Sequence, residues 1–173
     1  MEKSRPDPIR FRGKDRTTLG PALRVGQAAP DFVATARDWS AVHPIADAAG
    51  KVRVLAAVPS LDTSVCDKET RRFNEEAAGL DPDVRIFVLS TDLPFALDRW
   101  CTAAAVDRVT TLSDHNSADF GMKYGCLLDE ARVLRRAVFV VDRKGVVVYA
   151  DYMPALSEEP DYEEVLAEAR KAL

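Results

Sequence analysis

Three cysteines, Cys66, Cys101 and Cys126, are the side chains best suited to redox chemistry in this chain of 173 residues. Their odd number and wide spacing do not form a disulfide framework, and the sequence contains no Cys-x-x-Cys pair. In a reducing compartment structural disulfides are rare, and a disulfide there is more often transient and catalytic. The cysteines are therefore either small buried hydrophobes or the reacting groups of a thiol enzyme.

Cys66 has the sequence context of a reactive thiol. It follows a predicted buried strand over 52–58, and a predicted helix over 65–80 begins beside it. If Thr63 is the N-cap, Cys66 occupies the third helical position. Unpaired backbone N–H groups and the positive end of the helix dipole there favour the thiolate, which is the nucleophile. The alternative is that Cys66 only begins the apolar stripe that continues through Phe73, and position alone does not decide between the two.

The residues from Pro59 to Cys66, PSLDTSVC, resemble the active-site signature of peroxiredoxins, and in particular that of the thiol peroxidase branch. The resemblance covers most of the chain, because further similar segments follow one another in the family's order. These segments are 9–13 (IRFRG), 25–32 (VGQAAPDF), 90–96 (STDLPFA), 99–101 (RWC), 112–114 (LSD), 120–121 (FG), 124–125 (YG), 136–142 (RAVFVVD) and 159–162 (EPDY). Several matches in the right order are far more specific than any one of them.

The resemblance implies roles for five side chains. Cys66 matches the peroxidatic cysteine, which attacks the peroxide, and Cys101 matches the resolving cysteine, which captures the oxidised sulfur as an intramolecular disulfide. Thr63 matches the residue whose hydroxyl hydrogen-bonds the peroxide and the sulfur, and Pro59 the ring that shields the site from water. Arg136 matches the arginine that holds the thiolate and polarises the peroxide. Fixed donors of this kind stabilise a transition state in which charge moves from sulfur to the leaving oxygen.

Each of these side chains also has a purely structural interpretation. Pro59 can end a strand and Thr63 can cap a helix, alongside the catalytic role or instead of it. Cys101 shares a helix face with apolar side chains, which by itself favours core packing. Its place near the end of a helix disfavours a thiolate and fits a resolving rather than an attacking cysteine. Arg136 and its neighbour Arg135 point to opposite faces of a strand, so only one can serve, and the family pattern selects Arg136.

The resemblance also implies partners. Hydrogen peroxide and organic or lipid hydroperoxides are the expected substrates, thioredoxin is the expected reductant, and a homodimer is the expected assembly. We expect no cofactor and no metal, because His43 and His115 lie far apart and away from every cysteine in the sequence. Cys126 stands where the family usually has a small apolar residue, which favours a buried hydrophobe over the alternative that Cys126 takes part in a different disulfide. A disulfide needs two Cα atoms within about 4.4–6.8 Å, so we expect the helix around Cys101 to rearrange on oxidation.

The elements that must position these residues follow an α/β pattern. Predicted strands cover 32–35, 52–58, 84–89, 109–112, 137–141 and 146–150, and predicted helices cover 65–80, 117–124 and 161–173. A further short helix begins near Pro94, is capped by Asp92 and ends around 101–105. Residues 142–145 form a hairpin turn, and 9–13 pairs with 17–19 around a polar turn at 14–16. Together with the resemblance, this predicts a thioredoxin-like fold with a central mixed sheet flanked by helices and a short N-terminal β-hairpin.

Composition limits the remaining possibilities. The length fits a single domain, and together with the resemblance this predicts one thioredoxin-like peroxiredoxin domain over 1–173, with 1–6 disordered. The net charge of −4 provides no basic footprint for nucleic acid. No apolar run approaches the roughly 20 residues of a membrane span, and charges and prolines occupy the place of a secretory signal. We therefore expect a cytoplasmic protein that binds neither nucleic acid nor membrane.

Two other functional classes remain open at this point. A non-enzymatic redox sensor or chaperone on the same scaffold would be switched by peroxide rather than consume it. Catalytic turnover in the presence of thioredoxin, its reductase and NADPH distinguishes an enzyme from such a sensor. A disulfide oxidoreductase is disfavoured by the missing Cys-x-x-Cys, and a metal-binding role is weaker still.

Overall fold

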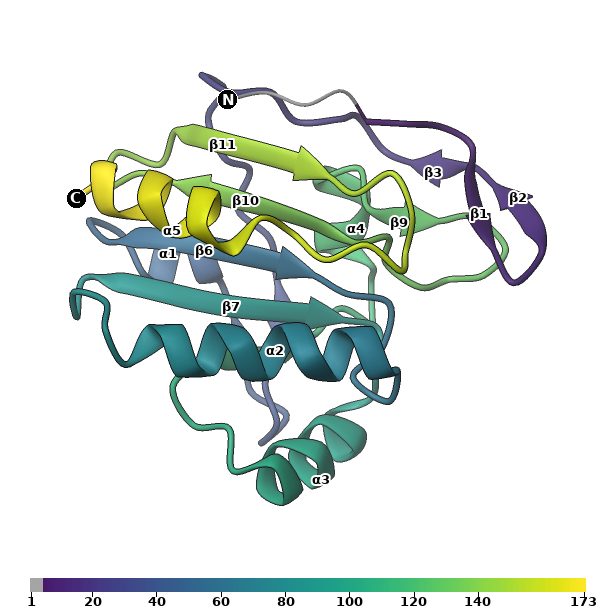
Figure 1. Cartoon of the computed structure of the whole chain (residues 1–173), viewed down its shortest axis with the longest axis horizontal. Coiled ribbons are helices and arrows are strands. Elements are labelled where there is room, and N and C mark those ends of the chain that lie inside the picture. Colours follow the sequence, from purple (N-terminus) through teal and green to yellow (C-terminus); the bar gives the residue numbers. More distant parts are fainter. Residues whose placement is uncertain (1–4) are drawn as a thin grey trace.

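The computed structural model describes residues 5–173. Its centre is one sheet formed by the strands β4 (Ala34–Thr35), β5 (Ala41–Val42), β6 (Val52–Ala57), β7 (Val84–Ser90), β8 (Thr110–Ser113), β10 (Ala137–Val141) and β11 (Val147–Tyr152). The strand order is β11-β10-β6-β7-β8-β4-β5 (Figure 1). β6, β7 and β8 are parallel, whereas β10, β11, β4 and β5 pair antiparallel with their neighbours. The predicted mixed sheet is confirmed.

Helices cover both faces of this sheet. They are α1 (Pro44–Asp47), α2 (Ser64–Ala77), α3 (Pro94–Ala104), α4 (Asp119–Lys123) and α5 (Tyr162–Lys171). Figure 1 shows α2 and α5 in front of the sheet, α1 and α4 behind it, and α3 below α2. Within residues 5–173, every helix is too short or too polar to cross a bilayer.

Each face of the sheet has its own hydrophobic core, because successive side chains of a strand point to opposite faces. Along β6, Leu55 and Ala57 belong to the core that contains Phe120 of α4. Val54 and Ala56 belong to the core that contains Phe73 of α2. Full burial of each large apolar side chain contributes about 1.5–3 kcal/mol. This second core fixes α2, α3 and α5 against the sheet, and it is the core in which Cys66 and Cys101 lie.

Two short antiparallel ribbons accompany the sheet: β1 (Ile9–Phe11) with β2 (Lys14–Arg16), and β3 (Thr18–Leu19) with β9 (Leu127–Leu128). The N-terminal hairpin is therefore present, but the prediction of its second strand was wrong. The turn is formed by Arg12 and Gly13, which both have positive φ, as a two-residue hairpin turn requires. Residues 14–16, predicted to be the turn, form the second strand, and 18–19 pair with β9 instead.

The start of α3 also differs from the prediction. Its N-cap residue is Leu93, and Asp92 does not cap the helix. The Asp92 carboxylate instead accepts hydrogen bonds from Ser60 Oγ at 2.7 Å, Leu61 N at 2.8 Å and Ser90 Oγ at 2.8 Å. These donors satisfy the carboxylate more completely than one helix N–H would. Asp92 therefore fastens the loop before α2 to the end of β7.

The N-terminal segment is partly described. Of the six residues expected to be disordered, 1–4 lie outside the described residues. Arg5 donates to the carbonyl oxygens of Gly20 at 2.9 Å and Gly125 at 3.2 Å. The carbonyl of Pro6 accepts from Arg135 at 2.8 Å. Charged hydrogen bonds thus join residues 5 and 6 to the domain.

Candidate active site

Cys66 lies in the first turn of α2, directly after the loop that follows β6. Thr63 is the N-cap residue, and Cys66 is therefore the third helical residue, as predicted. Because β6 is one of the three parallel strands of the sheet, this loop opens at the carboxyl ends of those strands, where α/β proteins bind ligands. The N-terminal end of the 14-residue helix provides unpaired N–H groups and a positive dipole end. Both favour an anionic sulfur.

The Thr63 hydroxyl bridges two groups. It lies 2.8 Å from Cys66 Sγ and 2.9 Å from the carbonyl oxygen of Ser60, and it makes no capping hydrogen bond, so the simple-cap interpretation is wrong. A hydroxyl has a single hydrogen. The hydroxyl can therefore donate to only one of these two acceptors at a time, and toward an anionic sulfur it can act only as the donor.

Arg136 reaches the sulfur from the neighbouring strand. β10 runs antiparallel to β6 with Ala137 opposite Ala57, so the residue before β10 lies where the loop to Cys66 begins. Arg136 Nη2 donates to Cys66 Sγ at 3.2 Å. Its Nε and Nη2 also donate to the carbonyl oxygen of Leu156, at 3.1 and 3.0 Å. Sheet register and the Leu156 carbonyl together fix the orientation of the guanidinium.

Arg135 points to the other face of the strand, as predicted. Its guanidinium donates to the carbonyl oxygens of Pro6 at 2.8 Å and Met153 at 3.0 Å, and to the Thr18 hydroxyl at 3.1 Å. These contacts bind the N-terminal segment to the domain. Of the two adjacent arginines, only Arg136 hydrogen-bonds Cys66.

Glu69 is a member of the site that the sequence analysis missed. It lies one turn after Cys66 on α2, is fully buried, and accepts a hydrogen bond from Arg136 Nη1. Among residues 5–173, its second oxygen has no hydrogen-bond partner. Burial raises the pKa of Glu69 to about 7, and the neighbouring charge of Arg136 only partly offsets this effect. Burial also lowers the pKa of Arg136, but the charges of Glu69 and Cys66 outweigh it and raise the value above its usual range.

Arg136 therefore stands between two acidic groups, the thiol of Cys66 and the carboxyl of Glu69. The Cys66 side chain is fully buried within the α2-side core, but its sulfur has two polar partners, Thr63 and Arg136. Thr63 is itself exposed, so the site meets solvent at this hydroxyl. Pro59 is buried in the same loop. This arrangement places the Cys66 sulfur between a hydroxyl and a cation, next to solvent, where both groups can hydrogen-bond a thiolate.

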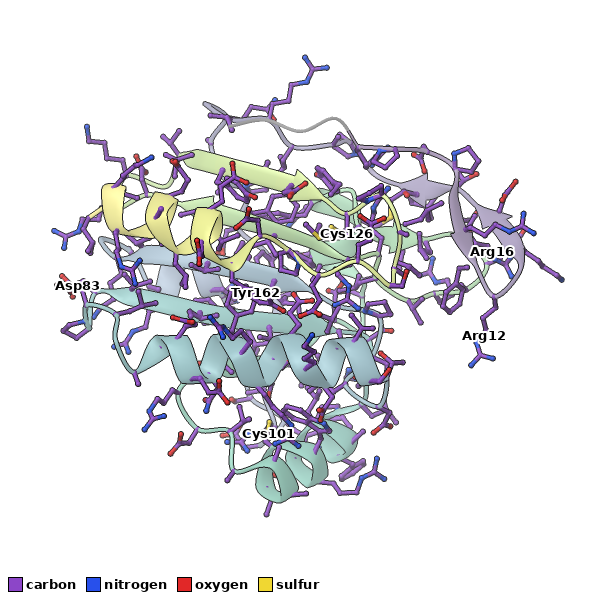
Figure 2. The ribbon with its side chains drawn as sticks, in the orientation of Figure 1. Arg12, Arg16, Asp83, Cys101, Cys126 and Tyr162 are labelled. Atoms are coloured by element: carbon purple, nitrogen blue, oxygen red, sulfur yellow. The ribbon has the colours of Figure 1, made fainter. Side chains whose placement is uncertain are left out.

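Cys101 lies in the last turn of α3, and Figure 2 places it beneath α2. The residue is 3% exposed, and its sulfur lies 3.2 Å from the Thr111 hydroxyl. All three cysteines are free. Cys66 and Cys101 belong to the same core cluster but stand on two separate, intact helices. The structure therefore corresponds to the reduced form.

Cys126 lies apart from this pair. It belongs to the core on the other face of the sheet, and Figure 2 shows it far from Cys101. Its thiol donates to the carbonyl oxygen of Tyr124 at 3.4 Å, and burial raises its pKa. The interpretation of Cys126 as a small buried hydrophobe is confirmed.

The family follows from comparisons of the whole chain. The Redoxin family model matches residues 24–166. The thiol peroxidase of Oceanobacillus iheyensis is 50% identical over 163 residues, which are 94% of this chain and 98% of that protein. The thiol peroxidase of Bacillus subtilis is 47% identical over 165 residues, 95% and 97% of the two chains. This chain belongs to the thiol peroxidase branch of the peroxiredoxin family. It is a peroxiredoxin-type oxidoreductase, and its activity is that of a thiol-dependent peroxidase.

Solved structures agree with this membership. The peroxiredoxin-like protein of Aquifex aeolicus has a TM-score of 0.86 and 37% identity, and the match covers 95% of this chain and 96% of that one. The thiol peroxidase of Chromobacterium violaceum has a TM-score of 0.81 at 17% identity, with 95% and 98% covered, and shares the fold. The predicted thioredoxin-like fold is thereby confirmed.

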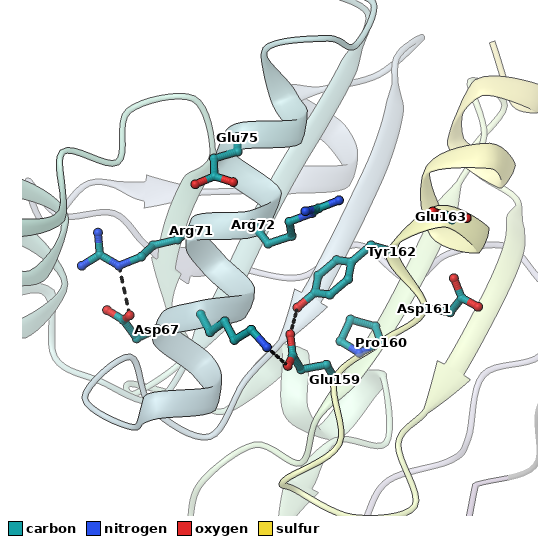
Figure 3. Close-up of a pocket in the computed structure, with 10 residues that line it drawn as sticks. Asp67, Arg71, Arg72, Glu75, Glu159, Pro160, Asp161, Tyr162 and Glu163 are labelled. Carbon is teal, nitrogen blue, oxygen red and sulfur yellow. Dashed lines mark hydrogen bonds and ion pairs between the residues drawn. The ribbon is translucent and has the colours of Figure 1, made fainter.

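A separate groove of about 700 Å³ lies on the outer side of α2, facing the segment before α5 (Figure 3). Lys68 pairs with Glu159 there at 2.6 Å, and Glu159 accepts from the Tyr162 hydroxyl at 2.8 Å. Cys66, Thr63 and Arg136 are not among its lining residues, so the groove is distinct from the thiol site. No cluster of three or more metal-ligating side chains occurs in the described part of the chain.

Proposed function

We propose that Cys66 is the peroxidatic cysteine of a thioredoxin-dependent peroxidase. The observation that carries this proposal is the position of Cys66 Sγ, 2.8 Å from the Thr63 hydroxyl and 3.2 Å from Arg136 Nη2 at the start of a helix. Two donors of different kinds converge on one sulfur, and both stabilise it as the anion.

In the first step the Cys66 thiolate attacks one oxygen of a hydroperoxide, R–O–O–H. The O–O bond breaks, the sulfur becomes a sulfenic acid, and RO⁻ leaves and takes up a proton. Negative charge moves from the sulfur to the leaving oxygen during this step. Thr63 and Arg136 are preorganised donors beside that path, so they stabilise the transition state more than the ground state. Pro59 shields the same site from water.

In the second step Cys101 resolves the sulfenic acid. Its thiol condenses with Cys66–SOH to form the disulfide and release one water molecule. In the reduced form Cys101 is packed in α3 against Thr111. We therefore propose that α3 opens in the oxidised form. A helix of 11 residues is held mainly by its packing, so such an opening is accessible.

The remaining partners belong to the same proposal. An external dithiol must reduce the disulfide, because the chain has no Cys-x-x-Cys. We propose thioredoxin for this step, hydrogen peroxide together with organic and lipid hydroperoxides as substrates, a homodimer as the assembly, and the cytoplasm as the compartment. The two relatives named as thiol peroxidases support a thiol-dependent peroxidase reaction, on which these proposed partners depend.

The test is continuous turnover. The protein is supplied with thioredoxin, thioredoxin reductase, NADPH and an alkyl hydroperoxide, and NADPH oxidation is followed. Many equivalents consumed per chain are expected, and the Cys66→Ser variant loses turnover whereas Cys126→Ser retains it. Consumption that stops at one equivalent identifies a peroxide-triggered switch and contradicts the enzymatic proposal.

A further inference from the structure

Arg71 of α2 makes two contacts with α3 and a third with its neighbour Asp67 on α2. Arg71 Nη1 donates to the carbonyl oxygen of Ala104, the last residue of α3, at 3.2 Å. The Arg71 guanidinium also lies over the Trp100 ring, 5.5 Å from its centroid. Its Nε donates to Asp67 Oδ2 at 3.0 Å, which Figure 3 shows as a dashed line. Arg71 thus touches both the end of α3 and the residue beside Cys101.

Asp67 closes this set of contacts. Its second carboxylate oxygen accepts a hydrogen bond from Trp100 Nε1 at 3.0 Å. Asp67, Arg71 and Trp100 therefore form a closed ring in which each side chain contacts the other two. Two members come from α2 and one from α3. We call this set, together with the Arg71–Ala104 hydrogen bond, the α3 clasp.

The clasp brackets Cys101. Trp100 precedes Cys101 directly, and Ala104 follows it by three residues, so both contacts with α3 fall within one helical turn of the resolving thiol. For a disulfide the Cα atoms of Cys66 and Cys101 must approach to about 4.4–6.8 Å. A turn held at both ends cannot swing toward Cys66 while the clasp is closed.

We propose that Arg71 is a positioning residue that holds the resolving turn of α3 in the reduced form and sets the rate at which Cys101 is released to the oxidised Cys66. This inference rests on the proposed resolving role of Cys101. The step that it controls is Cys66–SOH + HS–Cys101 → Cys66–S–S–Cys101 + H₂O. The clasp slows this condensation and so lengthens the life of the sulfenic acid, which a second peroxide molecule converts to sulfinic acid.

The contacts of the clasp are weak enough to break reversibly. The Arg71 side chain is 45% exposed and that of Asp67 36% exposed, so each polar contact is weak compared with a buried pair. One exposed hydrogen bond and one cation–π contact together shift the equilibrium between closed and open α3 by roughly five- to thirtyfold. We therefore expect Arg71→Ala to speed disulfide formation by up to roughly this factor, because α3 opens more often.

The neighbouring residue provides a matched control. Arg72 stands on the same helix with 50% side-chain exposure, pairs with Glu76 at 2.6 Å and lies over the Tyr162 ring at 5.8 Å. Figure 3 shows Arg71 and Arg72 pointing in opposite directions from α2. Arg72→Ala removes the same charge from the same helix and leaves the clasp intact.

The experiment is a rapid-quench measurement. Reduced wild type, Arg71→Ala and Arg72→Ala are mixed with an alkyl hydroperoxide, quenched in acid and analysed by mass spectrometry for sulfenic acid, disulfide and sulfinic acid. Faster conversion of sulfenic acid to disulfide and less sulfinic acid at high peroxide are expected in Arg71→Ala alone. Equal conversion in all three proteins, or slower conversion in Arg71→Ala, overturns the clasp.

Two further measurements distinguish a failure of the clasp proposal from poor folding of a variant and from a failure of the proposed function. Arg71→Lys keeps the charge, but one ammonium cannot contact Asp67, Ala104 and the Trp100 ring together, so we expect its rate of disulfide formation to lie between those of wild type and Arg71→Ala. This variant also tests the clasp if Arg71→Ala folds poorly. Amide hydrogen exchange of the reduced proteins over 94–104 should be faster in Arg71→Ala and unchanged in Arg72→Ala. Unchanged exchange in both variants refutes the clasp. If the proposed function fails instead, wild type forms no Cys66–Cys101 disulfide, whereas the exchange result still decides on the clasp.

Discussion

Arg136 has two tasks that can be separated by mutation. It donates to the Cys66 sulfur through Nη2 and neutralises the buried Glu69 through Nη1. Arg136→Met removes both contacts at once. We predict that this variant loses peroxidase activity and also becomes less stable, because Glu69 is left buried without a cation. The double variant Arg136→Met/Glu69→Met removes the stranded carboxyl as well.

The structure sets the size of the two effects. Arg136 is 1% exposed and Glu69 is fully buried, so removing one partner of the pair costs about 3–5 kcal/mol of unfolding free energy. Replacing both partners by apolar side chains of similar volume is close to neutral or stabilising by about 1–4 kcal/mol. Loss of a donor aimed at the developing charge costs roughly 10²–10³-fold in rate, and the second substitution does not restore it.

The assay combines urea unfolding of the reduced proteins with the rate of thiol loss after mixing with an alkyl hydroperoxide. The single variant should be unstable and slow, and the double variant stable and slow. The instability of the single variant should grow as pH rises above 4.5, the ordinary pKa of Glu69. Burial raises this pKa in the folded state, and the loss of Arg136 removes the charge that opposes the rise, so the folded state holds a proton that the unfolded state has lost. A double variant that regains activity, or a single variant as stable as wild type, refutes this reasoning.

Three further predictions concern single side chains. Thr63→Val removes the hydroxyl at Cys66 Sγ and should slow thiol loss by roughly 10²-fold, whereas Thr63→Ser keeps most of the rate; equal rates in both would contradict the role of the hydroxyl. Cys101→Ser should stop at the sulfenic acid and proceed to sulfinic acid with excess peroxide, as mass spectrometry will show; an unchanged product pattern argues against a resolving role. The pKa of Glu69 is about 7 in the folded state against an ordinary 4.5, so the free energy of unfolding should fall as pH rises from 4.5 to 7. Glu69→Gln should reduce this dependence of unfolding free energy on pH, as urea titrations at several pH values will measure. An identical slope in both proteins would exclude Glu69 as its source.

The sequence predicted the elements whose pattern is regular over many residues. The strand over 137–141 has the bounds of β10, because a continuous apolar run next to a turn signal identifies a buried strand. The turn after it is also as predicted, with the Asp142 carboxylate accepting from the main-chain N–H groups of Lys144 and Val146. The short elements α1, β5 and β9 were not predicted, because two to four residues are too few to display a period.

The positions of site residues could be predicted from the sequence where they depend on a single helix or strand. The positions of Thr63 and Cys66 follow from helix capping, and the opposed directions of Arg135 and Arg136 follow from strand alternation. Glu69 was missed, although its spacing of three residues from Cys66 places it on the buried face of α2. Its cation lies 67 residues away in the sequence, so only the fold shows which arginine neutralises it.

The central claim is that the Cys66 sulfur, held as an anion by Thr63 and Arg136, takes one oxygen from the peroxide and then forms a disulfide with a single partner thiol, releasing that oxygen as water. The most direct measurement is peptide mapping by mass spectrometry after the reduced protein reacts with one equivalent of an alkyl hydroperoxide. A Cys66–Cys101 disulfide with Cys126 left as a free thiol is the predicted result. A disulfide that contains Cys126, or a Cys66 that remains unmodified while peroxide disappears, would contradict the account.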